Sequence, residues 1–323
     1  MRSELRIAVV VLAVVTMLAI AMPFWKWRGP GPLKAPIHFV VPQGATIASV
    51  ARKLEDAGAV RSGVWFRRLA MRLGSRDHIK AGEFVIPAQA SPATILDLFQ
   101  HGRPVQRIIV VPEGAPALVV ADKLRAEPLL TGAVTIPAEG SVLPDGYSFE
   151  RGETRAAVLA RMQEAMTRTL ASLWRARKPT AVVTSPQQAV ILASVVEKET
   201  GVAAERGTIA GVYSNRLRAG MLLQADPTVI YPITKGLPLG RRIRESELKA
   251  DNGYNTYARA GLPIGAITNP GRASIAAVLN PAPTQALYFV ADGKGGHVFA
   301  NTLAEHSANK ARWFAIRRAR GEM

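Results

Sequence analysis

The 323-residue sequence contains no cysteine. This absence excludes disulfide bonds, thiolate nucleophiles and metal sites built on cysteine. It leaves the compartment open, because a chain without thiols suits oxidising and reducing surroundings alike. Any chemistry must therefore be sought among the other side chains.

Several short catalytic and ligand-binding motifs are also missing. There is no H-E-x-x-H zinc motif, no phosphate-binding P-loop and no G-x-S-x-G nucleophile motif. The histidines, among them His78, His101, His297 and His306, lack the spacing of metal ligands, so we expect neither a metal nor a cofactor. The segment "DGKGG" (Asp292 to Gly296) lacks the Gly-Lys-Ser/Thr ending of a phosphate loop and predicts a hairpin turn.

Acidic residues are scarce relative to basic ones. The 24 Asp and Glu face 41 Lys and Arg, a formal net charge of +17. Such a balance favours an anionic partner, whether nucleic acid, phospholipid head groups or an anionic cell-wall polymer, and it also fits a cationic surface with no specific ligand. Hydrophobic residues make up 48% of the chain, enough for a folded core, and the length predicts two or three folded units.

The amino-terminal segment is the longest apolar run. No charged residue occurs from Ile7 to Trp25, a length close to the ~20 residues that span a bilayer as a helix. Trp25 and Trp27 lie at its end beside Lys26 and Arg28, which resembles an interfacial aromatic and basic anchor. We therefore expect a transmembrane anchor. Basic residues on its two sides are balanced and leave the orientation open, but a very short amino-terminal tail before a large folded remainder favours a cytoplasmic tail and an exported body.

A cleaved signal peptide is the alternative interpretation. Arg2 and Arg6 would form its basic region, and Ala19-Ile20-Ala21 would be its cleavage site. The apolar run exceeds the ~7–15 residues of a usual signal-peptide core, which favours the anchor. Both interpretations export the remainder of the chain, and an exported body argues against a nucleic-acid partner.

A repeated pattern follows a Gly/Pro linker at residues 28–36. Residues 39–54 ("FVVPQGATIASVARKL") match residues 109–124 ("IVVPEGAPALVVADKL") in register, and residues 84–99 give a fainter echo. Each copy predicts a short strand, a proline-containing turn and an amphipathic helix. A second helix at 62–74 and a strand at 81–86 make the first region similar to the sugar-binding LysM module, although a purely structural spacer fits equally well.

A long helix is predicted at residues 155–177, after a Gly-rich and acidic segment at 139–155. Pro179 ends this pattern, and a second helix begins at Ser185-Pro186, where the serine can cap and proline suits the first helical position. Gln188 completes an S-x-x-Q capping box, and Gly201 is a natural stop.

The end of this second helix carries two acids, in "LASVVEKETG". Glu199 continues the apolar stripe of Leu192, Val195 and Val196, because residues three and four apart share a helix face. Glu197 lies about 200° away round the helix, so the two acids cannot form a facing pair. We expect Glu197 to be solvated or to pair with a base such as Lys198 or Arg206.

The position of Glu199 predicts a raised pKa. Desolvation disfavours the carboxylate, and the negative end of the helix dipole acts in the same direction. A carboxylic acid that stays protonated near neutral pH is suited to general-acid catalysis. The alternative is a glutamate whose stem packs while its carboxylate reaches water.

Downstream segments supply amide, tyrosine and carboxylate side chains on predicted turns. Gln224 and Asp226 lie in "NRLRAGMLLQADPTVIY" (residues 215–231), and Tyr254 and Asn255 lie in "NGYNTYARAGLPIGAITNPG" (residues 252–271). Amides bond sugar hydroxyls and aromatic faces stack on sugar rings, so this composition is typical of a glycan cleft.

These segments resemble a known family. "EKET", "NRL…GM.LQ.DPTVIY", "YNTY…GLP.GAI.NPG" and "LYFVADGKGGH.F" are similar to the signature segments of the endolytic murein transglycosylase, or YceG-like, family. The resemblance implies a single-pass protein of the cytoplasmic (inner) membrane, with its amino terminus in the cytoplasm and its body facing the periplasm or cell wall. It also implies internal cleavage of peptidoglycan glycan strands between N-acetylmuramic acid and N-acetylglucosamine, which leaves 1,6-anhydromuramoyl ends and would terminate glycan elongation.

The resemblance assigns catalysis to Glu199, the second glutamate of E-K-E-T, which the helix-face argument selects independently. Such a lyase needs one acid, because the C6 hydroxyl of the sugar replaces water as nucleophile, whereas ordinary glycosidases need two carboxylates. We expect Gln224, Asp226, Tyr254 and Asn255 to hold the glycan. The sequence departs from the family in "VLPDGYSF" (residues 142–149) and at Ile264, which affects only loop shape.

The resulting expectation is an α+β protein with a transmembrane helix, a LysM-like subdomain and a mixed α+β catalytic domain. The predicted segments are a cytoplasmic tail at 1–6, an anchor at 7–27, a linker at 28–36, the LysM-like region at 37–135 and the catalytic domain at 136–323. Expected partners are peptidoglycan strands, the cytoplasmic membrane and peptidoglycan synthases, with no nucleic acid. A hydrolytic muramidase that uses Glu199 with water and a non-catalytic peptidoglycan-binding scaffold are the alternatives.

Overall fold

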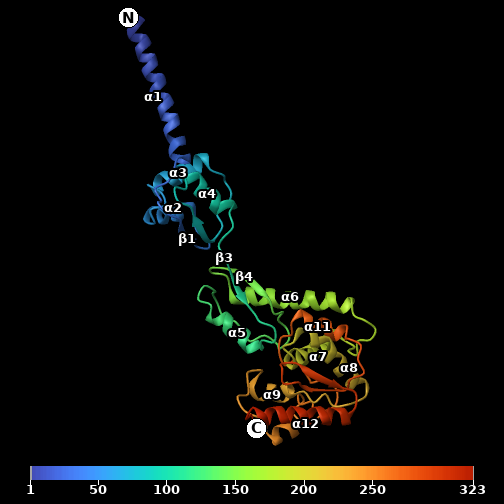
Figure 1. The fold of residues 1–323 in the computed structure, drawn as a ribbon. Coiled ribbons are helices and arrows are strands. Elements are labelled where there is room, and N and C mark those ends of the chain that lie inside the picture. Colours follow the sequence, from blue (N-terminus) through green and yellow to red (C-terminus); the bar gives the residue numbers. More distant parts are fainter. Residues whose placement is uncertain (1, 323) are drawn as a thin grey trace. The chain divides into compact units, whose positions relative to one another are not determined.

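The structure is a computed structural model that describes residues 2–322 (Figure 1). It contains two compact units, which are described separately below. Unit 1 comprises the chain up to residue 107 together with residues 149–152, and unit 2 comprises residues 108–148 and the chain from residue 153. Both units contain helices together with short strands that pair antiparallel in β1–β2 and β5–β6, which confirms the expected α+β class.

Helix α1 (Arg2–Arg28) contains the predicted apolar segment. Its residues 9–28 are long and apolar enough to cross a membrane, by length and composition, with a mean hydropathy of 2.1. A retained anchor and a signal sequence both have these properties. Exposed aliphatic side chains cover the described part of this helix, including Leu12, Val14 and Leu18.

The carboxyl-terminal end of α1 differs from the expectation in one respect. Trp25 is 61% exposed, as an interfacial residue would be, but Trp27 is only 4% exposed. The ring of Trp27 packs against Phe66, with 6.1 Å between the ring centroids. The prediction that Trp27 is an interfacial anchor is therefore wrong, because its indole belongs to the hydrophobic core of unit 1.

The Gly/Pro segment after α1 is held against the same unit. The Gly31 amide donates to the Gln89 carbonyl at 3.0 Å, and the Gln89 amide donates to the Leu33 carbonyl at 2.9 Å. A Cβ atom at Gly31 would come within 2.2 Å of the Ala90 carbonyl oxygen, so only glycine allows this close approach. The chain between α1 and the first strand is thus fixed by backbone hydrogen bonds.

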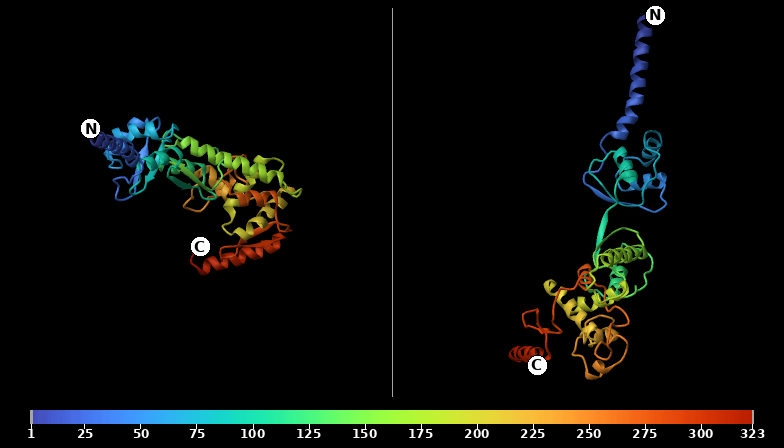
Figure 2. Two further views of the ribbon diagram at one scale, coloured as in Figure 1. Left: turned by 90° about the horizontal axis from the view of Figure 1, so that it is seen from above. Right: turned by 90° about the vertical axis from the view of Figure 1, so that its right-hand side faces the viewer.

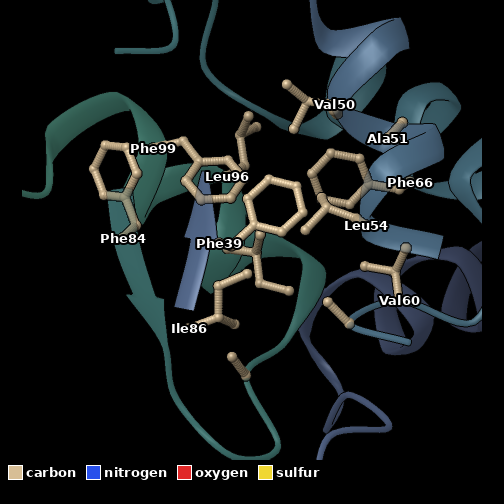
Figure 3. Close-up of a cluster of buried hydrophobic side chains, with 14 of the residues drawn as sticks. Phe39, Val50, Ala51, Leu54, Val60, Phe66, Phe84, Ile86, Leu96 and Phe99 are labelled. Atoms are coloured by element: carbon tan, nitrogen blue, oxygen red, sulfur yellow. The ribbon is translucent and has the colours of Figure 1, made fainter. Parts of the chain in front are cut away.

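Unit 1 has the predicted order of strand, two helices and strand. Strands β1 (Ile37–Val41) and β2 (Gly82–Ile86) pair antiparallel, and helices α2 (Ile47–Asp56), α3 (Gly63–Leu73) and α4 (Pro92–His101) surround them. Phenylalanine and leucine side chains from all these elements meet in the core (Figure 3). The compact α+β unit is confirmed, whereas its likeness to LysM stays a prediction.

The sequence repeat corresponds to repeated structure. Its copies fold as β1 and α2, as β2 and α4, and as β3 (Gln106–Val110) and α5 (Ala117–Ala126). Gly44 and Gly114 occupy equivalent turns with φ angles of 72° and 71°. This left-handed conformation explains why both Pro-x-Gly turns carry glycine.

Unit 2 is mainly helical, with a small antiparallel hairpin (Figures 1 and 2). Strand β4 (Gly146–Glu150) pairs with β3, and its residues 146–148 belong to this unit. The further elements of unit 2 are α6 (Arg155–Arg175), α7 (Pro186–Glu199), the short η1 (Ala203–Glu205), α8 (Arg206–Arg218), α9 (Asp226–Thr234), α10 (Glu245–Lys249), α11 (Arg272–Leu279), β5 (Tyr288–Ala291), β6 (His297–Ala300) and α12 (Leu303–Ala319). Helix α7 contacts α6, α8, α9 and α11. It is therefore the central helix of this unit.

The predicted hairpin turn at residues 292–296 is confirmed. It joins β5 to β6, and the Asp292 carboxylate accepts hydrogen bonds from the amides of Lys294 and Gly296. His297, the first residue of β6, places Nδ1 2.8 Å from Glu205. This histidine thus has a structural partner at the end of η1.

The core position of Trp27 predicts an asymmetry between the two tryptophans. Trp27→Ala removes a buried ring, so we expect unit 1 to lose about 3–5 kcal/mol of stability. Trp25→Ala removes an exposed ring, so it should change the stability of unit 1 by no more than about 0.5 kcal/mol. Hydrogen–deuterium exchange of peptides from α3, in the full chain in detergent, measures both. Equal effects of the two substitutions would contradict the core assignment.

Candidate active site

Helix α7 fixes the position of the glutamate singled out from the sequence. The Ser185 hydroxyl caps the helix by accepting from the Gln188 amide at 3.1 Å. The Gln188 side chain accepts from the Thr184 amide at 2.8 Å, and from the Thr184 hydroxyl, instead of closing a box with Ser185. The serine cap is confirmed, but the capping-box prediction is wrong by one residue, because the glutamine reaches further back along the chain.

The predicted stripe of α7 is buried. Leu192, Val195 and Val196 have no exposed surface, and Glu199 follows them as the last residue of the helix. One carboxylate oxygen of Glu199, Oε1, is buried and has no hydrogen-bond partner among the described residues. The carboxyl group therefore lies where a charge is poorly solvated.

This environment changes the acidity of Glu199. Burial is the largest effect, and it raises the pKa of Glu199 to about 7. The hydroxyl of Tyr213 and the charge of Arg216 act in the opposite direction, whereas the negative charge of Asp226 adds to the increase. The raised pKa that the helix-face argument predicts is thus present, with desolvation as its main cause.

Glu197 has a different environment, although it is only two residues away. Its side chain is 5% exposed, and Oε2 accepts from the Gly271 amide at 2.9 Å. Its Oε1 lies 3.7 Å from the Arg206 guanidinium. The predicted pairing with Arg206 is confirmed and the solvated alternative is wrong, so Glu197 ties α7 to α8 and to the start of α11.

Glu199 lines a cleft with a volume of about 450 Å³. The structure brings Gln224 and Asp226 to the same cleft, as we expected for residues that hold a substrate. The other residues that line it come from α8, the loop before α9, the loop after α10, β5 and α12, and they are Arg216, Leu223, Tyr257, Phe289, Val290, His306, Lys310, Trp313 and Phe314.

Arg216 is a cleft residue that the sequence reasoning missed. Its Nε donates to the Leu287 carbonyl at 2.6 Å, and Nη1 donates to the carbonyls of Leu222 and Leu223 at 3.0 Å each. Nη1 also lies 3.4 Å from the Gln224 amide oxygen. Burial lowers the pKa of Arg216. This arginine therefore fixes the chain before α9 and orients Gln224.

Asp226 begins α9 and brings a second carboxylate to the cleft. The hydroxyl of Tyr257 donates to its Oδ1 at 2.6 Å. Gln224, two residues before Asp226, has a positive φ of 53°. Its backbone N–H donates a hydrogen bond to the Thr256 carbonyl at 3.1 Å. Helix α9 thus brings Asp226 to the same cleft as Glu199, and the expectation that the reaction needs only one acid stays a prediction.

Tyr254 and Asn255 do not line this cleft. The Asn255 side-chain amide donates to three carbonyl oxygens at the end of α10, at 2.8–3.1 Å, and its oxygen accepts from the Tyr257 amide at 2.9 Å. The Tyr254 ring packs on Tyr231, with 4.9 Å between centroids. Asn255 thus shapes the loop that presents Tyr257, and a role in glycan binding for either residue stays a prediction.

Helix α12 forms a wall of the cleft that no sequence motif indicated. It contributes His306, Lys310, Trp313 and Phe314. The His306 ring stacks on Tyr288 with 5.1 Å between centroids, and burial lowers its pKa. Because these residues are spaced at three and four along one helix, the only available signal was an aromatic and basic face.

A buried acid in a polar cleft with amide, tyrosine and tryptophan side chains is typical of enzymes that act on glycans. The profile of the YceG-like family matches residues 39–312, which cover most of the chain and both units. The protein therefore belongs to the YceG-like family.

Curated relatives and a solved structure agree with this assignment. An endolytic murein transglycosylase of Bacillus subtilis is 34% identical over 179 residues, which cover 55% of this chain and 49% of that protein. One of Streptococcus pneumoniae serotype 2 is 27% identical over 320 residues, with 84% of this chain and 57% of that protein covered. The chain thus spans about half the length of these relatives.

The crystal structure of a putative yceG-like protein from Listeria monocytogenes is also similar. It matches with a TM-score of 0.52 and 27% sequence identity, and the match covers 85% of this chain and 99% of that chain. The likeness therefore extends beyond the cleft to most of the fold.

The burial of Glu199 predicts that a neutral side chain stabilises the protein in alkaline solution. Below the ordinary pKa of 4.5 the carboxyl is protonated in both folded and unfolded states, so it has no effect. Above its folded pKa of about 7 the buried carboxylate destabilises the fold, by at most about 3 kcal/mol. We therefore expect the change in the free energy of unfolding caused by Glu199→Gln to be more favourable to the folded state at pH 8 than at pH 5.

Urea unfolding of the wild type and the variant at both pH values measures this difference. Glu197→Gln is the matched control, because it loses an ion pair and should destabilise the protein at pH 5 and pH 8 alike. An equal loss of stability for Glu199→Gln at both pH values would contradict the raised pKa.

Proposed function

We propose that the protein is a membrane-anchored endolytic peptidoglycan transglycosylase. It cleaves bonds between N-acetylmuramic acid and N-acetylglucosamine within nascent glycan strands and leaves 1,6-anhydromuramoyl ends, which terminates glycan elongation. Membership of the YceG-like family and relatives named endolytic murein transglycosylase support this proposal. The basic composition suits an anionic wall polymer.

The observation that carries the proposal is the carboxyl group of Glu199, which lines the cleft and has a buried oxygen without a hydrogen-bond partner among the described residues. A carboxyl group with a pKa of about 7 holds its proton near neutral pH and still releases it readily. In the proposed reaction Glu199 gives this proton to the glycosidic oxygen as the bond from that oxygen to C1 breaks. The carboxylate then takes the proton of the C6 hydroxyl while O6 forms a new bond to C1, so Glu199 is regenerated and water is not consumed.

Neighbouring side chains have supporting roles in this mechanism. Gln224 bonds a sugar hydroxyl in this proposal, and its contact with Arg216, which orients its side chain, supports that role. The Asp226 carboxylate raises the pKa of Glu199, which helps the acid to keep its proton near neutral pH. Trp313 and Phe314 of α12 offer ring faces on which sugars stack.

The proposed location follows from α1. We propose that residues 7–27 anchor the chain in the cytoplasmic membrane, with the amino terminus in the cytoplasm and the body facing the cell wall. Nascent strands emerge at that surface, so peptidoglycan synthases are the expected protein partners. The LysM-like region then serves as a spacer or as a second grip on the glycan.

Hydrolysis by a muramidase is the second candidate function, and Asp226 is the observation that favours it. Glycosidases that hydrolyse their substrate use two carboxylates, and this cleft holds two, so in that mechanism Asp226 would act as the base that activates a water molecule. One oxygen of the Asp226 carboxylate already accepts a hydrogen bond from the Tyr257 hydroxyl, which argues against a free base. A substitution at Asp226 separates the two mechanisms.

Removal of the acid tests catalysis itself. We expect Glu199→Gln to lower kcat on purified glycan strands by ~10²–10⁴-fold, because amides cannot donate the proton. Glu164→Gln on the exposed face of α6 is the matched control and should leave kcat unchanged. A Glu199→Gln variant with wild-type kcat would rule out this acid, and a wild type without any cleavage would favour the scaffold alternative.

Removal of the second carboxylate tests the choice between lyase and hydrolase. In a transglycosylase Asp226→Asn lowers the pKa of Glu199, because a charge that raises it is gone. In the pH profile of kcat/KM, we therefore expect the decrease on the alkaline side to move to lower pH. The activity at acidic pH should stay within about tenfold of wild type. A loss of ~10²–10⁴-fold at every pH would instead identify Asp226 as the base of a hydrolase.

A further inference from the structure

The outer face of α3 combines apolar and basic side chains. Met71 is 71% exposed and Trp65 is 46% exposed, although both are large and apolar. Arg67, Arg68 and Arg72 are exposed on the same short helix, whose opposite side packs into the core of unit 1. Such a face is unusual for a protein surface that contacts only water.

The charge on this segment has one sign. Five arginines occur between residues 61 and 76, and the nearest acids in sequence are Asp56 and Asp77. None of these arginines forms an ion pair among the residues that the structure describes. The segment therefore presents uncompensated positive charge beside its apolar side chains.

The position of this face relative to α1 identifies its partner. Trp27, near the end of α1, packs on Phe66 of α3, and the Lys26 ammonium lies 4.8 Å from the centre of the Trp65 ring. Helices α1 and α3 are in contact, and Figure 1 shows α3 at the carboxyl-terminal end of α1. If α1 crosses a bilayer and leaves it near Arg28, α3 lies at the depth of the head groups.

A small cavity at this junction has matching chemistry. Its volume is about 190 Å³, and its walls include Trp25 and Trp65 together with the cationic residues Lys26 and Arg61. Tryptophan prefers the boundary between hydrocarbon and water, and arginine binds phosphate oxygens. The cavity and the α3 face therefore form one continuous surface suited to phospholipid.

We infer that the exposed face of α3 docks on anionic phospholipid head groups of the membrane that holds α1. Trp65 and Met71 enter the interface, and the arginines bind lipid phosphates. The inference rests on the membrane anchoring proposed above. Docking holds unit 1 against the bilayer.

The absence of cysteine makes a direct test possible, because one introduced thiol carries a unique label. The full chain, with a fluorophore on Met71→Cys, is reconstituted into phosphatidylcholine vesicles with or without phosphatidylglycerol. A nitroxide on the lipid head group quenches fluorophores at the interface. We expect quenching to be about threefold stronger in the anionic vesicles and to fall at high salt, because salt screens the arginines.

Matched variants separate charge from general effects. A triple variant that replaces Arg67, Arg68 and Arg72 with Glu should abolish the difference in quenching between neutral and anionic vesicles. The same change at Arg175, Arg312 and Arg318, which are exposed in unit 2, should preserve it. A label on Val40→Cys, 42% exposed on β1, should remain weakly quenched in both vesicles.

A label on Leu12→Cys distinguishes this inference from the anchoring on which it rests. Quenching of that label by a nitroxide in the lipid acyl chain reports insertion of α1. Two results, each seen together with quenching at Leu12, would overturn the docking of α3 alone. In the first, the Met71 label is quenched no more than the Val40 label. In the second, the Met71 label is quenched equally in neutral and anionic vesicles. An unquenched Leu12 label would overturn the anchoring and the docking together.

Discussion

Burial of one carboxyl group at the end of a central helix is the constraint on which the cleft depends. Residues 189–196 of α7 are buried, since α6, α8, α9 and α11 all contact this helix. The apolar stripe ends at Glu199, whose pKa rises to about 7 because its surroundings solvate a charge poorly. The packing that stabilises unit 2 therefore also sets the acidity of the proposed acid.

The groups around Glu199 shift its pKa in opposite directions. Asp226 raises the pKa of Glu199, whereas Tyr213 and Arg216 lower it. Arg216 has a second task, because its hydrogen bonds fix the chain that leads to Gln224. One buried arginine thus links the electrostatics of the acid to the shape of the substrate site.

The sequence was most informative where local geometry decides the outcome. Helix periodicity separated Glu199 from Glu197. It left Glu197 to water or to a base such as Lys198 or Arg206, and the structure has the pair with Arg206. The repeated Pro-x-Gly turns were recognisable because left-handed backbone requires glycine. The order of strands and helices in unit 1 followed from the same short-range signals.

Residues whose roles depend on tertiary packing were not predictable in this way. Trp27 looked like an interfacial residue, because sequence cannot tell an indole in a core from one beside lipid. Arg216 and the α12 residues reach the cleft from distant parts of the chain. The Asn255 amide satisfies backbone carbonyls, a task that asparagine performs as readily as it binds sugar.

The chemical identity of the product tests the central claim most directly. Purified glycan strands digested by the wild-type protein are analysed by mass spectrometry of the new ends. Transfer to the C6 hydroxyl leaves 1,6-anhydromuramic acid, which is lighter than the hydrolysis product by one water molecule, and reaction in ¹⁸O-labelled water adds no label. New ends that carry a reducing muramic acid with ¹⁸O would contradict the account and establish a hydrolase.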